Sequence, residues 1–167
     1  MNNILSNFDR TTCGLTMKVL STVSTGLYAG SAFYVSFVDN PARMTHDPVS
    51  AITMWKPSFV RAKRMQGKLV VLSALSSFGV YGCLLGETED QYLWLGAGVL
   101  MASLIPTTLI FMSPLHSQLI ETEKCISVKG DEWIIDHLNQ WNKLHNIRTF
   151  IGLSAFATMV YVLSKHR

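Results

Sequence analysis

The longest stretch without a formal charge most strongly constrains the fold of this chain. From Gln91 to Ile120, thirty consecutive residues include no Asp, Glu, Lys or Arg. An α-helix crosses the hydrocarbon core of a bilayer with about 20 apolar residues, so this stretch is long enough to span a membrane. Only 15% of the 167 residues are charged, against about 25% in soluble domains. The sequence therefore predicts an integral membrane protein.

Three further stretches without charge predict three more spans, at residues 19–38, 69–86 and 149–164. The last has 16 residues and covers roughly 24 Å as a helix, less than a core of ~30 Å. We therefore expect its helix to extend upstream to near Asp131, which could cap it. The predicted fold is all-α: a four-helix membrane bundle with helical spans near 17–38, 68–86, 91–115 and 147–164, no sheet, and an amphipathic connecting helix at 49–65 that is broken or kinked at Pro57.

The four spans form one domain, residues 15–167, after a polar N-terminal segment, residues 1–14. An even number of spans places both termini on the same side as the acidic residues 87–90. The two longer connections, on the other side, hold ten of the 14 Lys and Arg residues. By the positive-inside rule these connections face the cytoplasm or the mitochondrial matrix. The termini and residues 87–90 then lie on the non-cytoplasmic or intermembrane-space side, and the sequence leaves the identity of the membrane open.

Small residues and prolines predict how the spans pack. Gly26 and Gly30 are four apart, and such pairs let helices approach closely in lipid; we expect both to face another helix. The second span is rich in Ser and Gly, which indicates that it packs against protein. Pro41 predicts a turn or kink after the first span. Pro106 predicts a kink in the third, where threonine hydroxyls could satisfy freed carbonyls; the kink is either purely structural or opens a pocket.

Titratable and aromatic residues gather at the end of the bundle that carries the longer connections. This group consists of His46, His116, His137, His145, Trp55, Trp133 and Trp141. A pocket at the membrane edge is therefore the default site. We expect no metal there, because His137 and His145 are about 12 Å apart along a helix and no Glu-x-x-His pair occurs. The basic cluster at 61–64 is typical of a membrane anchor, so we expect no nucleic-acid partner.

Several short motifs, in this order, resemble a family of small four-span membrane proteins that includes the fungal anthrone oxygenases. The motifs are Gly26-Leu27-Tyr28-Ala29-Gly30, Asn40-Pro41-Ala42, Trp55 followed by Arg61 and Gln66, Ile105-Pro106-Thr107-Thr108 with Pro114, and Trp141-x-x-Leu144-His145-x-x-Arg148. The resemblance covers roughly residues 19–163. It implies an oxygenation of an anthrone to an anthraquinone without any cofactor. The partners that it implies are membrane lipid and an apolar aromatic ligand.

That chemistry needs a base, a cation for the resulting anion, and an apolar aromatic slot. Under the resemblance, His145 is the candidate base and Arg148 the candidate partner of the anion. The candidate substrate-binding residues are Trp55, Pro106, Thr107, His116 and Trp141. The alternative at each position is structural, with Arg148 reaching toward the headgroups and the aromatic side chains anchoring the interface.

Two other functions remain open. Small four-span proteins also serve as accessory subunits of larger membrane complexes, and small-residue pairs suit packing between chains as well as within one chain. Other membrane proteins are then the partners. A transporter is disfavoured, because no span carries a charge near its middle.

Overall fold

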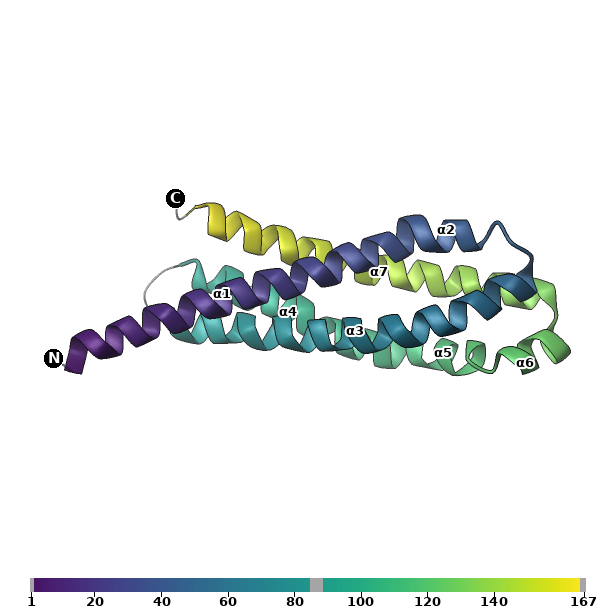
Figure 1. Cartoon of the computed structure of the whole chain (residues 1–167), viewed down its shortest axis with the longest axis horizontal. Coiled ribbons are helices and arrows are strands. Elements are labelled where there is room, and N and C mark those ends of the chain that lie inside the picture. Colours follow the sequence, from purple (N-terminus) through teal and green to yellow (C-terminus); the bar gives the residue numbers. More distant parts are fainter. Residues whose placement is uncertain (1, 85–88, 166–167) are drawn as a thin grey trace.

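The protein is described by a computed structural model that covers residues 2–84 and 89–165, with side chains from residue 12 onward. Four long helices run along the length of a narrow bundle: α1 (Asn2–Tyr34), α3 (Pro48–Cys83), α4 (Gln91–Thr107) and α7 (Asp131–Ser164) (Figure 1). The described residues contain no strand. The start of α1 and the end of α7 lie at the same end of the bundle. The prediction of an all-α bundle is confirmed.

Shorter segments prolong two of the long helices. A π-helical turn η1 (Val35–Asp39) and α2 (Asn40–Arg43) follow α1, while η2 (Thr108–Met112) and α5 (Ser113–Leu119) follow α4. Two further short segments, α6 (Thr122–Lys124) and η3 (Cys125–Lys129), lead into α7. These segments build the end of the bundle opposite the termini (Figure 1). The helices therefore reach well beyond the spans that charge alone delimits.

The predicted upstream extension of the fourth helix is confirmed, because α7 begins at Asp131 and continues without a break through residues 141–149. The connecting helix at 49–65 is not separate: it is the first half of α3, which passes through Pro57 uninterrupted. Asp47 caps α3 by accepting a hydrogen bond from the amide of Ser50 at 3.0 Å. Hydrogen bonding from the Ser50 side chain, and then from its amide, lowers the pKa of the Asp47 carboxyl. The predicted end of the second span, residues 85 and 86, and the first two residues of the acidic segment at 87–90 lie outside the described residues.

The helix continues through Pro41 to Arg43, and the predicted turn follows at residues 44–46. A wider π turn comes immediately before Pro41, and the amide of Asn40 bonds to the carbonyl of Val35, five residues back. The same arrangement precedes Pro114, where the amide of Ser113 bonds to the carbonyl of Thr108. A proline ring clashes with the carbonyl four residues earlier in an α-helix. A π turn at that point moves this carbonyl away and keeps the helix intact.

The packing of α1 on α3 relies on small hydroxyl side chains. Ser21 and Ser77 approach to 2.6 Å between their oxygens, and Thr25 is hydrogen-bonded to Ser73 one turn further along. All four side chains are buried. This confirms that the second span packs against protein through its serines.

The two glycines of the first span have different surroundings. A Cβ on Gly26 would lie 2.8 Å from Cε2 of Phe156 on α7, so this glycine allows close approach as predicted. A Cβ on Gly30 would meet nothing within 4 Å, and Gly30 is exposed. The prediction that Gly30 faces another helix of the bundle is therefore wrong. Four residues advance a helix by somewhat more than one turn, which is enough to move the second glycine out of the contact.

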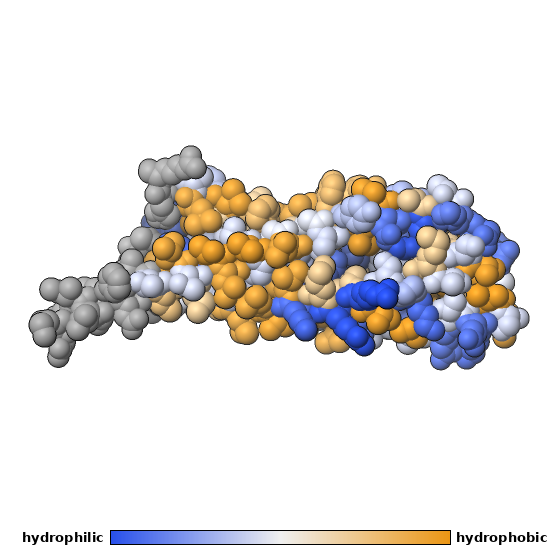
Figure 2. All heavy atoms as spheres, in the orientation of Figure 1, coloured by the Kyte–Doolittle hydropathy of each residue, from blue (hydrophilic) through white to orange (hydrophobic). Residues whose placement is uncertain are grey.

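Two helical stretches, Gln91–Leu119 and Asp131–Ser164, are long and apolar enough to cross a membrane. On the face shown in Figure 2, hydrophobic residues cover the half of the bundle toward the termini, and hydrophilic residues gather at the opposite end. Large apolar side chains such as Leu109, Ile110 and Phe111 are exposed on the bundle surface. This distribution suits association with lipid.

Candidate functional site

A cavity of about 280 Å³ opens in the half of the bundle that is remote from the termini. Nine of its lining residues come from α3, and the others come from η1, α2, α4, η2, α5 and α7. Five of the seven predicted site residues line it, although they come from three different helices: Trp55, His116, Trp141, His145 and Arg148. The tertiary structure thus brings together side chains that are up to 93 positions apart in the chain.

Pro106 and Thr107 do not line the cavity, and their predicted contact with substrate is not supported by the geometry. Their neighbours Ile105 and Thr108 do line it. The hydroxyl of Thr107 instead donates to the carbonyl of Ser103 at 2.7 Å. Successive residues of a helix point about 100° apart, so one or two positions along the sequence separate the cavity face from the outer face.

Aromatic rings form one wall of the cavity. Trp55 and Phe59, one turn apart on α3, stack with centroids 4.6 Å apart and planes inclined by 7°. Trp141 from α7 meets Trp55 edge to face at 5.7 Å, and His116 lies 4.3 Å from Phe59 between ring centroids. Such offset and edge-to-face contacts stabilise a rigid aromatic surface. A flat apolar ligand would find a preformed slot along this wall.

A hydrogen bond from Trp141 defines which ring nitrogen of His116 is protonated. The indole nitrogen of Trp141 is 3.1 Å from Nε2 of His116, and both side chains are buried. An indole nitrogen can only donate, so Nε2 of His116 accepts and carries no proton. The imidazole is then neutral, with its proton on Nδ1. The lone pair of His116 is already engaged and is not free to take a proton from a ligand.

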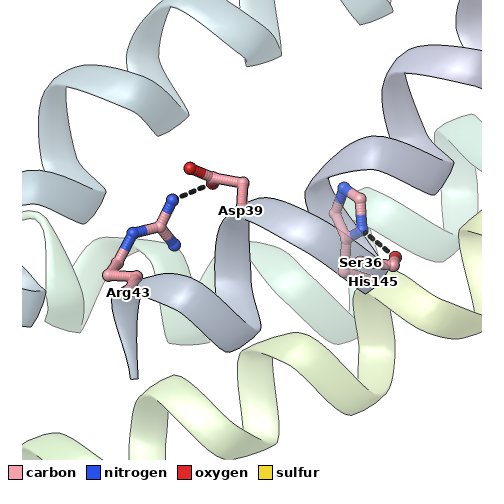
Figure 3. Close-up of polar contacts among 4 residues, drawn as sticks. All are labelled: Ser36, Asp39, Arg43 and His145. Atoms are coloured by element: carbon pink, nitrogen blue, oxygen red, sulfur yellow. Dashed lines mark hydrogen bonds and ion pairs between the residues drawn. The ribbon is translucent and has the colours of Figure 1, made fainter. Parts of the chain in front are cut away.

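His145 has the opposite arrangement. Its Nδ1 is 3.0 Å from Oγ of Ser36 (Figure 3), and Ser36 Oγ is 2.8 Å from Oγ1 of Thr149. The Thr149 hydroxyl also reaches the carbonyls of His145 at 3.1 Å and Ala32 at 3.3 Å. Every donor is used when Thr149 donates to a carbonyl, Ser36 donates to Thr149, and Nδ1 of His145 donates to Ser36. Nε2 of His145 then keeps a free lone pair.

Arg148 provides a positive charge without a carboxylate partner among the cavity residues. One guanidinium nitrogen, Nη1, lies 3.8 Å from the sulfur of Met112, and the guanidinium carbon is 6.0 Å from the centre of the Tyr28 ring. Its Nε is buried and has no hydrogen-bond partner among the described residues. The residues that line the cavity include no Asp or Glu. An anionic ligand would therefore meet an unneutralised cation there.

Several cavity residues were not predicted from the sequence as parts of the site. Arg43, 3% exposed, lines the cavity and forms an ion pair with Asp39 (Figure 3). The spacing of four residues between Asp39 and Arg43 is a recognisable helical ion-pair signal. Lys63 and Gln66 also line the cavity. Ser36, which bonds to the cavity residue His145 without lining the cavity itself, had no usable signal in the sequence, because His145 lies 109 positions away.

The other two candidate histidines lie outside the cavity. His46 is exposed, and His137 stacks on Trp133 with centroids 3.7 Å apart while its Nδ1 lies 2.9 Å from the carbonyl oxygen of Trp133. Within residues 2–84 and 89–165, no group of three or more His, Cys, Asp or Glu side chains is arranged to hold a metal ion. The polar groups that line the cavity are two imidazoles, two guanidiniums, one ammonium, one amide, two indoles and two hydroxyl groups.

Comparison with known proteins identifies one matching protein family. The chain matches no curated protein. It also matches no solved structure. The sequence model of the anthrone oxygenase family matches residues 55–158, which is more than half of the chain and includes all five predicted residues that line the cavity. Ser36 and Arg43 lie outside the matched range. The chain therefore belongs to the anthrone oxygenase family.

Proposed function

We propose that this protein is a multi-pass membrane enzyme that oxygenates an apolar aromatic substrate of the anthrone type without a cofactor. The observation that carries the proposal is the cavity itself. It combines a rigid aromatic wall, a neutral imidazole with a free lone pair at His145, and the cation of Arg148, with no carboxylate among the lining residues. Membership of the anthrone oxygenase family supports the same chemistry.

The substrate carries a CH₂ group that is acidified by a carbonyl and two flanking aromatic rings. Nε2 of His145 takes one proton from this carbon as the general base. The electron pair that is left behind spreads onto the carbonyl oxygen, where the guanidinium of Arg148 stabilises the developing negative charge. Trp55 and Trp141 hold the ring plane so that the acidic C–H faces the imidazole.

The anion then reduces molecular oxygen, and no metal or flavin is needed because the substrate supplies both electrons. A carbon–oxygen bond forms, and the product is a hydroperoxide once the proton is returned. Loss of the second C–H proton breaks the O–O bond, forms the new carbonyl and releases water. One O₂ is consumed and one water formed for each CH₂ that becomes C=O.

The proposed topology has four spans, formed by α1 with η1, the second half of α3, α4 with η2, and α7. The cavity then lies toward the side of the membrane that carries the longer connections and most of the Lys and Arg residues. By the positive-inside rule that side is the cytoplasm or the mitochondrial matrix. Placement near the interface suits a substrate that has an apolar ring system and polar edges.

Oxygen uptake by the protein purified in mild detergent tests the proposal, with anthrone as the substrate and anthraquinone as the product measured. We expect His145→Ala to abolish O₂-dependent quinone formation while the melting temperature remains close to that of the wild type. His137→Ala is the matched control, because this histidine is on the same helix outside the cavity. Arg148→Lys should retain part of the rate, since the charge survives without the planar fork.

The competing role, an accessory subunit of a larger membrane complex, gives a different result in the same preparation. A partner that co-purifies in fixed stoichiometry, together with no oxygen uptake from anthrone or from a related phenol, would support the subunit and reject the enzyme. Oxygen uptake that persists in His145→Ala would keep the enzyme and reject His145 as its base.

A further inference from the structure

The mouth of the cavity is framed by two helices. On α3, Lys63, Gly67 and Val71 follow one another at intervals of four residues, so they form one stripe. All three line the cavity and are exposed. On the other side of the mouth stand Ile105 and Leu109, also four residues apart.

The exposed fractions of these residues locate the opening. Val71 is 46% exposed, Ile105 42% and Leu109 64%, although each of them lines the cavity. The rim is therefore apolar and lies on the outer surface of the bundle between α3 and α4. In a membrane protein such a rim contacts lipid, because water would leave these side chains unfavourably exposed.

Gly67 leaves the gap in this rim. It stands at the middle of the α3 stripe, between Lys63 and Val71, and a Cβ at this position would meet no atom within 4 Å. The missing side chain therefore does not serve helix packing, unlike Gly98, where a Cβ would lie 2.9 Å from the Cβ of Ser77. Any larger side chain at residue 67 would project into the mouth.

The charges around the cavity indicate which end of a ligand lies where. The ammonium of Lys63 is 5.8 Å from the ring centre of Phe59, at the polar end of the stripe. No Asp or Glu lines the cavity to neutralise it. The rest of the rim is apolar. A ligand that slides in edge-on would therefore keep its rings against the apolar rim and an anionic oxygen near Lys63.

We infer that the gap at Gly67, between α3 and α4, is a lateral entrance through which an aromatic substrate with an anionic oxygen substituent passes from the lipid into the cavity, guided by Lys63. This inference rests on the proposed function for the identity of the ligand. It assigns to Gly67 and Lys63 roles in access and selectivity, which are separate from the roles of His145 and Arg148 in the reaction.

The entrance is tested by ligand binding rather than by turnover. The protein is reconstituted in phosphatidylcholine nanodiscs, and the quenching of its tryptophan fluorescence by anthraquinone-2-carboxylate or by unsubstituted anthraquinone is followed with time. We expect Gly67→Leu to slow the association of both probes by about tenfold. Dissociation should slow as well, because an obstructed entrance hinders passage in both directions.

Two further variants separate obstruction from misfolding. Gly67→Ala adds a Cβ that has room, and it should show a smaller slowing than Gly67→Leu. Gly96→Leu is the matched control: Gly96 is exposed on α4, has no neighbour within 4 Å of its Cβ position, and does not line the cavity. Association rates for Gly67→Leu equal to those of Gly96→Leu would overturn the inference, as would faster dissociation with unchanged association.

The charge at the entrance is tested with the same two probes. Lys63→Gln should weaken binding of the carboxylate several-fold and leave unsubstituted anthraquinone unaffected, while Lys68→Gln, exposed on the same helix away from the cavity, should change neither. Equal effects on both probes would overturn the role of Lys63.

The entrance and the proposed function can fail separately. If the protein shows no oxygen uptake but its association rates depend on Gly67, the entrance is supported and the proposed function is rejected. If oxygen uptake is normal and Gly67→Leu has no effect on association, the proposed function is supported and the entrance is rejected.

Discussion

The indole nitrogen of Trp141 donates a hydrogen bond to Nε2 of His116 across 3.1 Å, although the two residues belong to different helices. This contact engages the lone pair of one cavity histidine and leaves His145 as the imidazole with an available nitrogen. The two cavity histidines thus differ in whether they keep a free lone pair. The difference follows from which nitrogen of each ring is hydrogen-bonded and to which partner.

Trp141→Phe should weaken substrate binding more than it slows the reaction. Phenylalanine keeps part of the aromatic wall but leaves the buried Nε2 of His116 without its donor, which costs about 1–3 kcal/mol of stability. We expect a raised KM in oxygen-uptake assays, a kcat close to that of the wild type, and a lower melting temperature. Trp133→Phe, on the same helix outside the cavity, should leave KM unchanged. A large fall in kcat with normal KM would contradict this assignment.

Ser36→Ala should lower kcat while KM stays nearly constant. The Ser36 hydroxyl oxygen accepts a hydrogen bond from the protonated Nδ1 of His145 and so favours the tautomer in which Nε2 carries no proton. Loss of a hydrogen bond worth about 1 kcal/mol corresponds to roughly a fivefold change. Nitrogen NMR of the His145 ring should show Nδ1 protonated in the wild type and a mixture of tautomers in the variant.

The control for Ser36→Ala is Ser24→Ala. Ser24 lies on α1 and is also buried, but within the described part of the chain its hydroxyl bonds to the carbonyls of Leu20 at 2.6 Å and Ser21 at 3.1 Å and not to His145. The Ser24→Ala substitution should leave both kcat and the nitrogen NMR spectrum of the His145 ring unchanged. An unchanged spectrum in Ser36→Ala would show that Ser36 does not orient the imidazole.

Gly26→Leu should destabilise the bundle, and Gly30→Leu should not. A Cβ at Gly26 would press against the ring of Phe156 at 2.8 Å, whereas the space around Gly30 is open. Overpacking of this kind costs about 1–3 kcal/mol. Melting temperatures of the two variants in one detergent test the difference. Equal melting temperatures would mean that the contact between α1 and α7 at Gly26 does not contribute to stability.

Asp39→Asn should destabilise the protein because it leaves the buried guanidinium of Arg43 without its carboxylate. Removal of one partner from a buried ion pair costs about 3–5 kcal/mol, and the partial exposure of Asp39 places the effect at the lower end. Glu121→Gln is the control, because its ion pair with Lys124 is exposed and is worth about 0–1 kcal/mol. Similar melting temperatures for both variants would rule out a structural role for the Asp39 pair.

The all-helical fold, the upstream extension of α7 to Asp131 and the end of the bundle where the cavity lies were all predictable from the sequence. These properties depend on local features. An uncharged run that is too short to cross a bilayer predicts that its helix extends further, and residues at helical spacing share a face whatever lies opposite. Trp141, His145 and Arg148 were therefore predictable as one stripe, and all three line the cavity.

The orientation of individual side chains around the cavity depends on the packing of the helices and was not predictable from the sequence. The π turns η1 and η2 each insert an extra residue into a helical turn and so rotate the faces that follow. A period of 3.6 residues does not anticipate this rotation for the residues that follow each π turn. Contacts between distant segments, such as Ser36 with His145, arise where separate helices meet. They depend on the mutual rotation of those helices, which packing determines and no local sequence pattern encodes.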